Sequence, residues 1–287
     1  MEEEYKAIGR LMKAARRYKK ENQESVSKAI GCSQSALSKL EHGTLVPSAP
    51  QWFDFCRYLE IPVVSLESSV IDRHFPLSSL DVPSIVKWPK RYRMFRGLKS
   101  RELYPFVSYL RQSQGDEAVE KMFDSLGIDI DLAVDFDHQI NHFLVFDIIY
   151  YFIKNNICNI QNIKVLGSRY ASPIFHGELM KEYQKTKSLS SLMEAFIREQ
   201  KFYQMDFKFE LVSSSERACV LSLKPEKHFD YFLKEVSADV MDFYRYYMKS
   251  KIEHFLSAIL KRNIVINQGQ VLAPQGLPER YEIILTD

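Results

Sequence analysis

The sequence predicts an α+β protein with a small all-α N-terminal domain and a larger mixed C-terminal domain. Apolar residues recur at helical spacing within residues 1–66, and helical and alternating patterns mix from residue 103 onward. Residues 67–86 are rich in Ser, Pro and Asp and show no sustained period. A chain of 287 residues is long enough for two hydrophobic cores. We therefore predict domains at 1–66 and 103–287, joined by residues 67–102.

Residues 22–43 predict two short helices that meet at a glycine turn. Asn22 can cap the first helix and Ser33 the second, and Gly31 can adopt the positive φ of a tight turn. Apolar side chains mark the inner faces of the pair: Val26, Ile30, Ala36, Leu37 and Leu40. The outward positions of the second helix carry compact hydrogen-bonding side chains and one cation: Ser33, Gln34, Ser35, Ser38 and Lys39. Such side chains have the length and chemistry needed at a base edge or a phosphate.

This block resembles the XRE (Cro/CI-type) helix-turn-helix family, whose signature runs from a Gln-Glu opening to a Ser-x-x-Glu-x-Gly close. The resemblance covers roughly residues 4–66 and implies a DNA-binding domain. It implies that Gln34 and Ser35 read bases, with Lys39 one turn further on, and that Gln23 hydrogen-bonds a phosphate. Ser27 departs from the alanine usual in the family, but it is small enough to let the two helices pack.

The flanking segments complete a predicted five-helix unit. Apolar stripes at helical spacing precede and follow the helix pair: Tyr5, Ile8, Leu11, Met12 and Ala15 before it, and Trp52, Phe53, Cys56 and Leu59 after it. Pro47 and Pro50 interrupt any helix between Gly43 and Gln51, and Pro62 ends the unit. Ile61, Val63 and Leu66 are expected to close its core.

The segment between Lys87 and Arg101 is strongly basic and carries three interleaved aromatic residues, Trp88, Tyr92 and Phe95. One interpretation makes it a second phosphate-contacting element, with contacts from Lys90, Arg91, Arg93 and Arg96. The other makes it a solvated connector whose aromatic residues pack on the next domain. We favour the connector.

The sequence of the C-terminal domain predicts helices and strands in mixed order. The patterns favour helices within 104–126 broken near Gly115, at 138–155 capped by Asp137, from Ser188 to about 201, and from 226 to about 262. They favour strands at 163–166, 205–211, 219–223, 264–267 and 281–285, of which 205–223 form a hairpin.

This order of elements resembles the ligand-binding and dimerisation region of some AraC-type regulators, which is similar in outline to haem-NO-binding domains. The resemblance rests on Leu126-Gly127-Ile128-Asp129, the helix after Asp137, residues 188–195 and the hairpin 206–223. No AraC-type DNA-binding region follows, so the resemblance leaves DNA binding to the N-terminal domain. It implies an architecture only.

Candidate metal and catalytic residues are few. His138 and His142 are four residues apart, a spacing that can place two imidazoles on one metal, but no third ligand is marked and a packed pair is the favoured interpretation. His176 is a single histidine between Phe175 and Gly177, which favours a structural role over a haem ligand. The sequence contains no P-loop, GxSxG elbow or paired catalytic carboxylates. We expect no enzyme activity, no cofactor and no metal.

Composition limits the setting of the protein. The four cysteines lie far apart without a CxxC pair, which favours reduced thiols in a cytosol. The best candidate for a membrane span, residues 143–153, is too short to cross a bilayer, and no signal peptide is visible. We therefore predict a cytoplasmic transcription regulator that binds double-stranded DNA as a homodimer and responds to an unknown small-molecule or protein effector. The alternative is a helix-turn-helix protein that acts as a protein-interaction scaffold.

Overall fold

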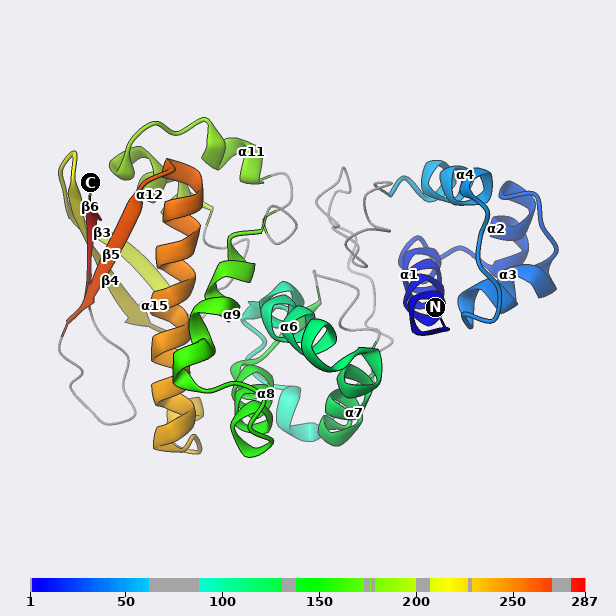
Figure 1. The fold of residues 1–287 in the computed structure, drawn as a ribbon, viewed down its shortest axis with the longest axis horizontal. Helices are drawn as coiled ribbons and strands as arrows, with labels where there is room; N and C mark the ends of the chain where they lie inside the picture. The colour runs from blue at the N-terminus through cyan, green and yellow to red at the C-terminus, as the bar shows by residue number, and fades with distance from the viewer. Residues whose placement is uncertain are drawn as a thin grey trace. The chain divides into compact units, whose positions relative to one another are not determined.

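A computed structural model describes residues 2–61, 88–130, 138–172, 176, 179–199, 207–226, 229–269 and 280–286. The chain divides into two compact units, residues 1–87 with 110–138, and residues 88–109 with 139–287 (Figure 1). The basic segment after residue 87 therefore falls in the second unit. The predicted domain limits stay a prediction.

Four helices make up the described N-terminal region: α1 (Glu2–Tyr18), α2 (Gln23–Ala29), α3 (Gln34–Glu41) and α4 (Ala49–Leu59). Their shared core contains Leu11, Met12, Ala15, Val26, Ile30, Leu37, Leu40, Trp52, Phe55, Cys56, Leu59 and Ile61. The described residues contain four of the five predicted helices, and Val63 and Leu66, expected to close the core, lie outside them. Phe53 was expected in this core but is exposed, because positions 52, 55, 56 and 59 share one face of α4 and position 53 does not.

The ends of these helices are fixed by local hydrogen bonds. The Asn22 carboxamide oxygen accepts a hydrogen bond from the backbone amide of Ser25 at 2.8 Å. The Ser33 hydroxyl accepts one from the backbone amide of Ala36 at 3.1 Å. Ser48 forms a capping box with Gln51 at the start of α4. Gly31 joins α2 to α3 with a φ of 67°, a conformation that glycine adopts without strain. The predicted helix pair and its two caps are confirmed.

Two helices, α6 (Tyr104–Gln114) and α7 (Asp116–Leu126), lie on either side of the predicted break at Gly115. The later helices are α8 (His142–Lys154), α9 (Ile163–Tyr170), α11 (Leu179–Gln184), α12 (Leu189–Arg198), α14 (Phe229–Leu233) and α15 (Ala238–Leu260). Short 3-10 turns cover Lys90–Tyr92, Ser100–Leu103 and Ile160–Asn162. The long helix α15 packs along α9 and also contacts α8 (Figure 1).

The strands form two antiparallel sheets. The larger has the order β3-β4-β6-β5, with β3 (Phe207–Ser214), β4 (Ala218–Pro225), β5 (Asn263–Gln268) and β6 (Arg280–Thr286). Buried residues alternate on β5 and at the start of β3 and β6, and α12 packs on β3 while α15 packs on β5. The smaller sheet pairs β1 (Leu98–Lys99) with β2 (Gln139–Ile140). The predicted α+β class, the hairpin and the final two strands are confirmed.

Three predicted elements of the second unit were wrong. Residues 163–166 are helical, because this apolar stretch packs as the first turn of α9 against α15. The predicted helix 138–155 begins only at His142, capped by Asn141, because Gln139 and Ile140 pair with β1. The predicted helix 226–262 is two helices, α14 and α15, and the second begins after Ser237.

Candidate DNA-recognition surface

The outward face of α3 carries the residues that the sequence selects for base reading. Gln34, Ser35 and Lys39 are exposed, whereas Leu37 and Leu40 on the opposite face are fully buried. Ser38 is half-buried, and the exposed Ser33 uses its hydroxyl to cap the helix. A glutamine carboxamide can bond an adenine edge through two hydrogen bonds, and a lysine can neutralise a phosphate. This face therefore offers base-reading and phosphate-binding chemistry on a helix anchored from behind.

A buried ion pair holds this helix in place. Arg16 on α1 donates through Nε and Nη2 to the two carboxylate oxygens of Glu41, the last residue of α3, at 2.5 and 2.9 Å. Arg16 Nη1 also donates to the carbonyl oxygen of Glu21 at 3.0 Å. The Glu41 side chain is only 1% exposed and that of Arg16 13%. A two-bonded arginine–carboxylate pair fixes direction as well as distance, so it sets the orientation of α3 on α1.

Gln23 extends this network from the start of α2. Its Nε2 atom donates to Glu41 Oε2 at 2.9 Å, so one carboxylate joins α1, α2 and α3. A carboxamide nitrogen carries two N–H groups, and the bond to Glu41 uses one of them. The predicted bond from Gln23 to a phosphate stays a prediction. Arg16 and Glu41 are not among the site residues predicted from the sequence, although Glu41 is the glutamate of the family signature.

Small residues bring the helices of this unit together. A Cβ atom on Gly9 would lie 2.5 Å from the carbonyl oxygen of Leu40, so α1 and α3 touch through their backbones there. Gly43 has a φ of 69°, and its Cβ would lie 2.5 Å from the Cα of Lys6. Ser27 is buried, and its hydroxyl donates to the Glu24 carbonyl oxygen at 2.9 Å, which satisfies the polar group that replaces alanine.

The basic segment is packed and paired in the second unit. Trp88 and Tyr92 are 7% and 4% exposed. Arg91 contacts Asp147 at 2.7 Å and Glu235 at 2.9 Å, and these carboxylates, Asp147 above all, raise the pKa of the guanidinium. Its guanidinium also lies 3.9 Å from the ring centroid of Phe143. This packing is what the connector interpretation expects.

The other candidate phosphate contacts differ in their surroundings. Arg93 Nε donates to the carbonyl oxygen of Trp88 at 2.8 Å, and the Arg96 guanidinium lies 5.8 Å from the Trp88 ring centroid. Lys90 is exposed. Asn141 ties the segment to the start of α8 by donating to the carbonyl oxygens of Arg91 and Met94. Phosphate contact by Lys90, Arg91, Arg93 and Arg96 stays a prediction.

His142 and His176 are packing residues in this structure. His138 precedes β2 and His142 opens α8, so the two do not share a helix as the metal-site spacing requires. His142 is fully buried among aromatic rings, with Nε2 3.3 Å from the hydroxyl of Tyr244. His176 lies 2.9 Å from the Tyr170 carbonyl oxygen, and burial lowers its pKa well below the usual value. Within the described ranges, no three possible ligands gather for a metal.

The N-terminal region matches a known protein family. Residues 7–68 match the family model described as "Helix-turn-helix domain". The chain therefore carries a helix-turn-helix domain, which is the hallmark of a DNA-binding regulator. The AraC-type resemblance of the C-terminal region is not confirmed. No curated protein matches the sequence.

Solved structures similar to this chain are distant. An Fe(II) unliganded H-NOX protein from K. algicida is 11% identical, covers 66% of this chain and 97% of its own, and gives a TM-score of 0.47. A Cs H-NOX mutant with an unnatural amino acid is 15% identical over 66% of this chain and 97% of its own, with a TM-score of 0.47. The apo competence regulator ComR from Streptococcus vestibularis is 12% identical over 90% of this chain and 73% of its own, with a TM-score of 0.21. At these values the likenesses assign no ligand or activity.

In the parts of the chain that the structure describes, no helix is long and apolar enough to cross a bilayer.

Proposed function

We propose that the protein is a sequence-specific transcription regulator of XRE type, without enzyme activity. The observation that carries the proposal is the exposed face of α3, where Gln34, Ser35 and Lys39 point away from a core that fixes the helix. Loss of a two-bonded contact between glutamine and adenine costs about 1–3 kcal/mol of discrimination. In this scheme Gln34 and Ser35 read bases, and Lys39 and Gln23 hold the phosphate backbone.

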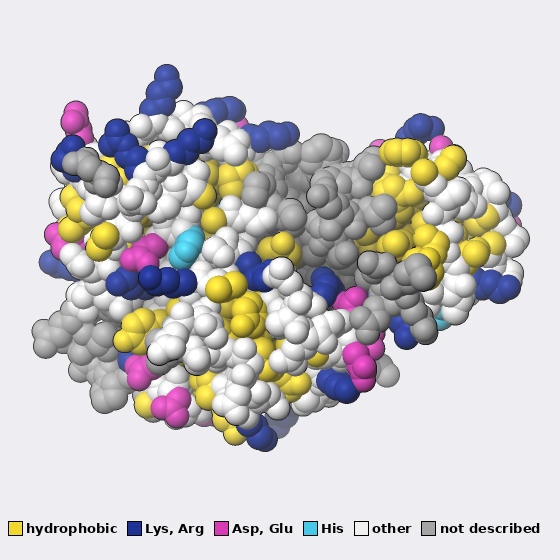
Figure 2. Space-filling model, viewed as in Figure 1, with side chains coloured by type: hydrophobic (Ala, Val, Ile, Leu, Met, Phe, Trp, Pro, Cys, Tyr) yellow, Lys and Arg dark blue, Asp and Glu magenta, His cyan; other side chains and the backbone are white. Residues whose placement is uncertain are grey.

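The regulator acts as a homodimer on a two-part operator. One short helix reads only a few base pairs, and two copies about 34 Å apart on one face of the duplex supply the affinity and length of a specific site. The N-terminal region also exposes large apolar side chains, among them Leu45 (45%), Val46 (37%) and Phe53 (49%). Hydrophobic side chains gather on the visible face of this domain (Figure 2). An apolar surface on a DNA-reading domain favours a contact with a second copy.

The second unit modulates DNA binding. Such modulation requires an effector whose affinity differs between two arrangements of the dimer. An aromatic-rich α+β domain that carries a helix-turn-helix module suits this role, because a ligand bound there can bias the spacing of two recognition helices.

The proposal is tested by selection of random duplex DNA with the full-length protein at about physiological ionic strength. We expect a two-part motif from the wild type and loss of specificity at one position of each half in Gln34→Ala. Gln184→Ala, an exposed glutamine on α11, is the matched control and should select the wild-type motif. Shallow, salt-sensitive binding without a motif would reject the proposal and favour the scaffold.

The dimer has a separate test. Sedimentation of the full-length protein at micromolar concentration should give the mass of two chains. A strictly monomeric mass, with and without the selected DNA, would reject this part of the proposal.

A further inference from the structure

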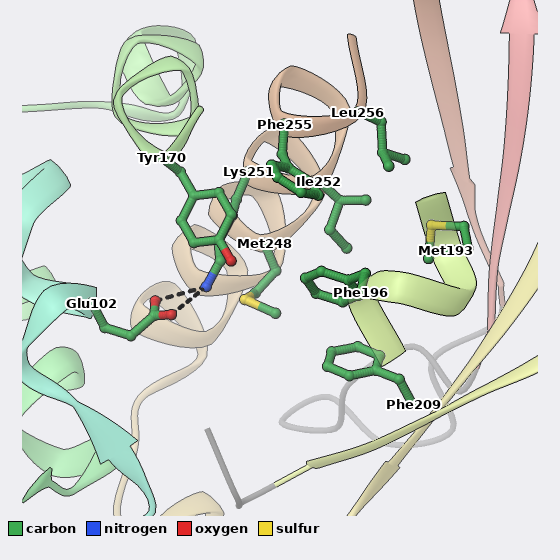
Figure 3. A pocket seen from close by; sticks show the side chains of 10 residues that line it. All are labelled: Glu102, Tyr170, Met193, Phe196, Phe209, Met248, Lys251, Ile252, Phe255 and Leu256. Atoms are coloured by element: carbon green, nitrogen blue, oxygen red, sulfur yellow. Dashed lines mark hydrogen bonds and ion pairs between the residues drawn. The ribbon is translucent and has the colours of Figure 1, made fainter. Parts of the chain in front are cut away.

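The second unit contains a small pocket between α9, α12, α15 and β3 (Figure 3). Its wall consists of aromatic, thioether and aliphatic side chains, including Met193, Phe196, Phe209 and Met248. Phe196 and Phe209 pack with ring centroids 5.5 Å apart. The pocket holds about 20 Å³ of free space, which is room for about one water molecule.

One end of this apolar pocket carries a buried ion pair. Lys251 Nζ on α15 lies 2.8 and 2.7 Å from the two carboxylate oxygens of Glu102. The two side chains are 10% and 7% exposed. Figure 3 shows both side chains reaching this end of the pocket beside the ring of Tyr170, whose centroid is 4.2 Å from Nζ. Burial lowers the pKa of Lys251, and Glu102 opposes that shift.

The geometry of α9 is built around this end of the pocket. A Cβ on Gly167 would lie 2.1 Å from the hydroxyl oxygen of Ser250, so α9 and α15 approach closely at that point. Tyr170 follows one turn later on α9 and Lys251 directly follows Ser250 on α15. The close approach therefore brings the Tyr170 ring face to the ammonium group, an arrangement that stabilises the cation.

The ion pair keeps more capacity to accept hydrogen bonds than to donate them. The ammonium has three donors, of which two bond the oxygens of Glu102, and it faces the Tyr170 ring. A carboxylate has about four acceptor positions, and Lys251 takes two of them. The pair is also electrically neutral as a whole, so a charged ligand would add an unbalanced charge to an apolar site. The site therefore suits an uncharged group that donates a hydrogen bond.

We propose that this pocket binds a small uncharged molecule with an aromatic or compact apolar body and one hydroxyl or N–H group, which donates to Glu102. The ligand opens the pocket by moving the side chains of Met193 and Met248, which are unbranched and repack easily. Because these side chains belong to α12 and α15, occupation of the pocket acts on the packing between the two helices.

The test measures binding of four single-ring probes to the full-length protein without DNA: phenol, benzoate, benzylamine and benzene. Dissociation constants and shifts in Tm are recorded for each. Phenol carries the donor without a charge, so we expect it to bind at least about tenfold more tightly than the other three. Absence of phenol binding, or tighter binding of benzoate or benzylamine, would overturn the proposal.

A paired variant identifies the groups responsible. Glu102→Met with Lys251→Met replaces both partners by apolar side chains, a change that folded proteins often tolerate. We expect it to bind phenol no better than benzene. The matched control is Glu182→Met with Lys185→Met, an exposed pair at the end of α11 that lies outside the pocket, and it should keep the preference for phenol. A paired pocket variant that also keeps the preference would refute the role of Glu102.

A second variant leaves the ion pair intact. Met193→Phe fills the pocket from α12 and should weaken phenol binding about tenfold or more, whereas unchanged binding would place phenol elsewhere. The idea that such a ligand regulates DNA binding rests on the proposed function. Because all affinities are measured without DNA, failure of ligand binding and failure of DNA recognition are separate results.

Discussion

Loss of the Glu41 carboxylate should weaken the DNA-recognition domain, because this group joins α1, α2 and α3. Glu41→Gln keeps the shape of the side chain and removes the charge that pairs with Arg16. Breaking a buried pair costs about 3–5 kcal/mol when the other charge is left behind. Arg16 keeps its bond to the Glu21 carbonyl oxygen and is 13% exposed, which lowers our expectation to about 2–3 kcal/mol.

That loss is large for so small a domain. Stabilities of about 0.05–0.15 kcal/mol per residue give a domain of this size roughly 3–9 kcal/mol in total. A loss of about 2–3 kcal/mol should lower its Tm by roughly 10–20 °C. Because only the folded domain presents α3 to DNA, the DNA affinity of the variant should fall at temperatures where its N-terminal domain begins to unfold.

Two tryptophans allow the measurement in the full-length protein. Trp52 is buried in the N-terminal core and Trp88 in the second unit, so a Trp88→Phe background makes fluorescence report the N-terminal domain alone. Glu24→Gln is the control, because the Glu24–Lys28 pair is exposed and should contribute less than about 0.5 kcal/mol. Equal stability of the Glu41→Gln and Glu24→Gln proteins would refute the reasoning.

Three further predictions concern backbone, pH and thiols. Gly43→Ala should destabilise the N-terminal domain by more than Gly31→Ala in urea unfolding, because both positions have positive φ but only a Cβ at Gly43 would meet neighbouring backbone; equal losses would contradict this. Burial keeps the pKa of His176 low, so the unfolded chain binds a proton at a higher pH than the folded chain does. The free energy of unfolding should therefore fall as the pH drops below about 6.5, by up to about 1.4 kcal/mol per pH unit. His176→Leu should remove this part of the pH dependence, and an unchanged dependence would contradict the prediction. The Cys158 thiol is buried, and burial raises its pKa to about 11. Iodoacetamide at about pH 8 should therefore modify the half-buried Cys32 well before Cys158, as followed by mass spectrometry. The reverse order of modification would contradict this prediction.

Features set by a few neighbouring residues could be predicted from the sequence. The caps at Asn22, Ser33 and Ser188 each need one side chain and an amide three residues further on, and all three form. The hairpin of β3 and β4 follows from alternating apolar residues around a serine-rich turn. The outward face of α3 follows from helical period alone.

Features that depend on distant partners could not be predicted in this way. β1 and β2 are two residues long each and pair across about forty residues of chain, so neither shows a period of its own. Residues 163–166 have the composition of a strand, but their packing against α15 makes them helical. Arg16 and Glu41 read as surface charges until the fold brings them together at the base of α3.

Two of the buried ion pairs in the described parts of this protein illustrate how surroundings separate a structural role from a binding role. Arg16 and Glu41 have the same chemistry as Lys251 and Glu102, a cation and a carboxylate taken out of water. Around Glu41, the bonds from Arg16 and Gln23 occupy most of the acceptor positions, and each bond ties down a helix. Around Glu102, one lysine is the bonded partner, and the pair faces a pocket walled by side chains that can move. Because a buried acceptor with unused capacity costs free energy until a donor arrives, the first pair is complete in the folded chain and the second is completed by a ligand.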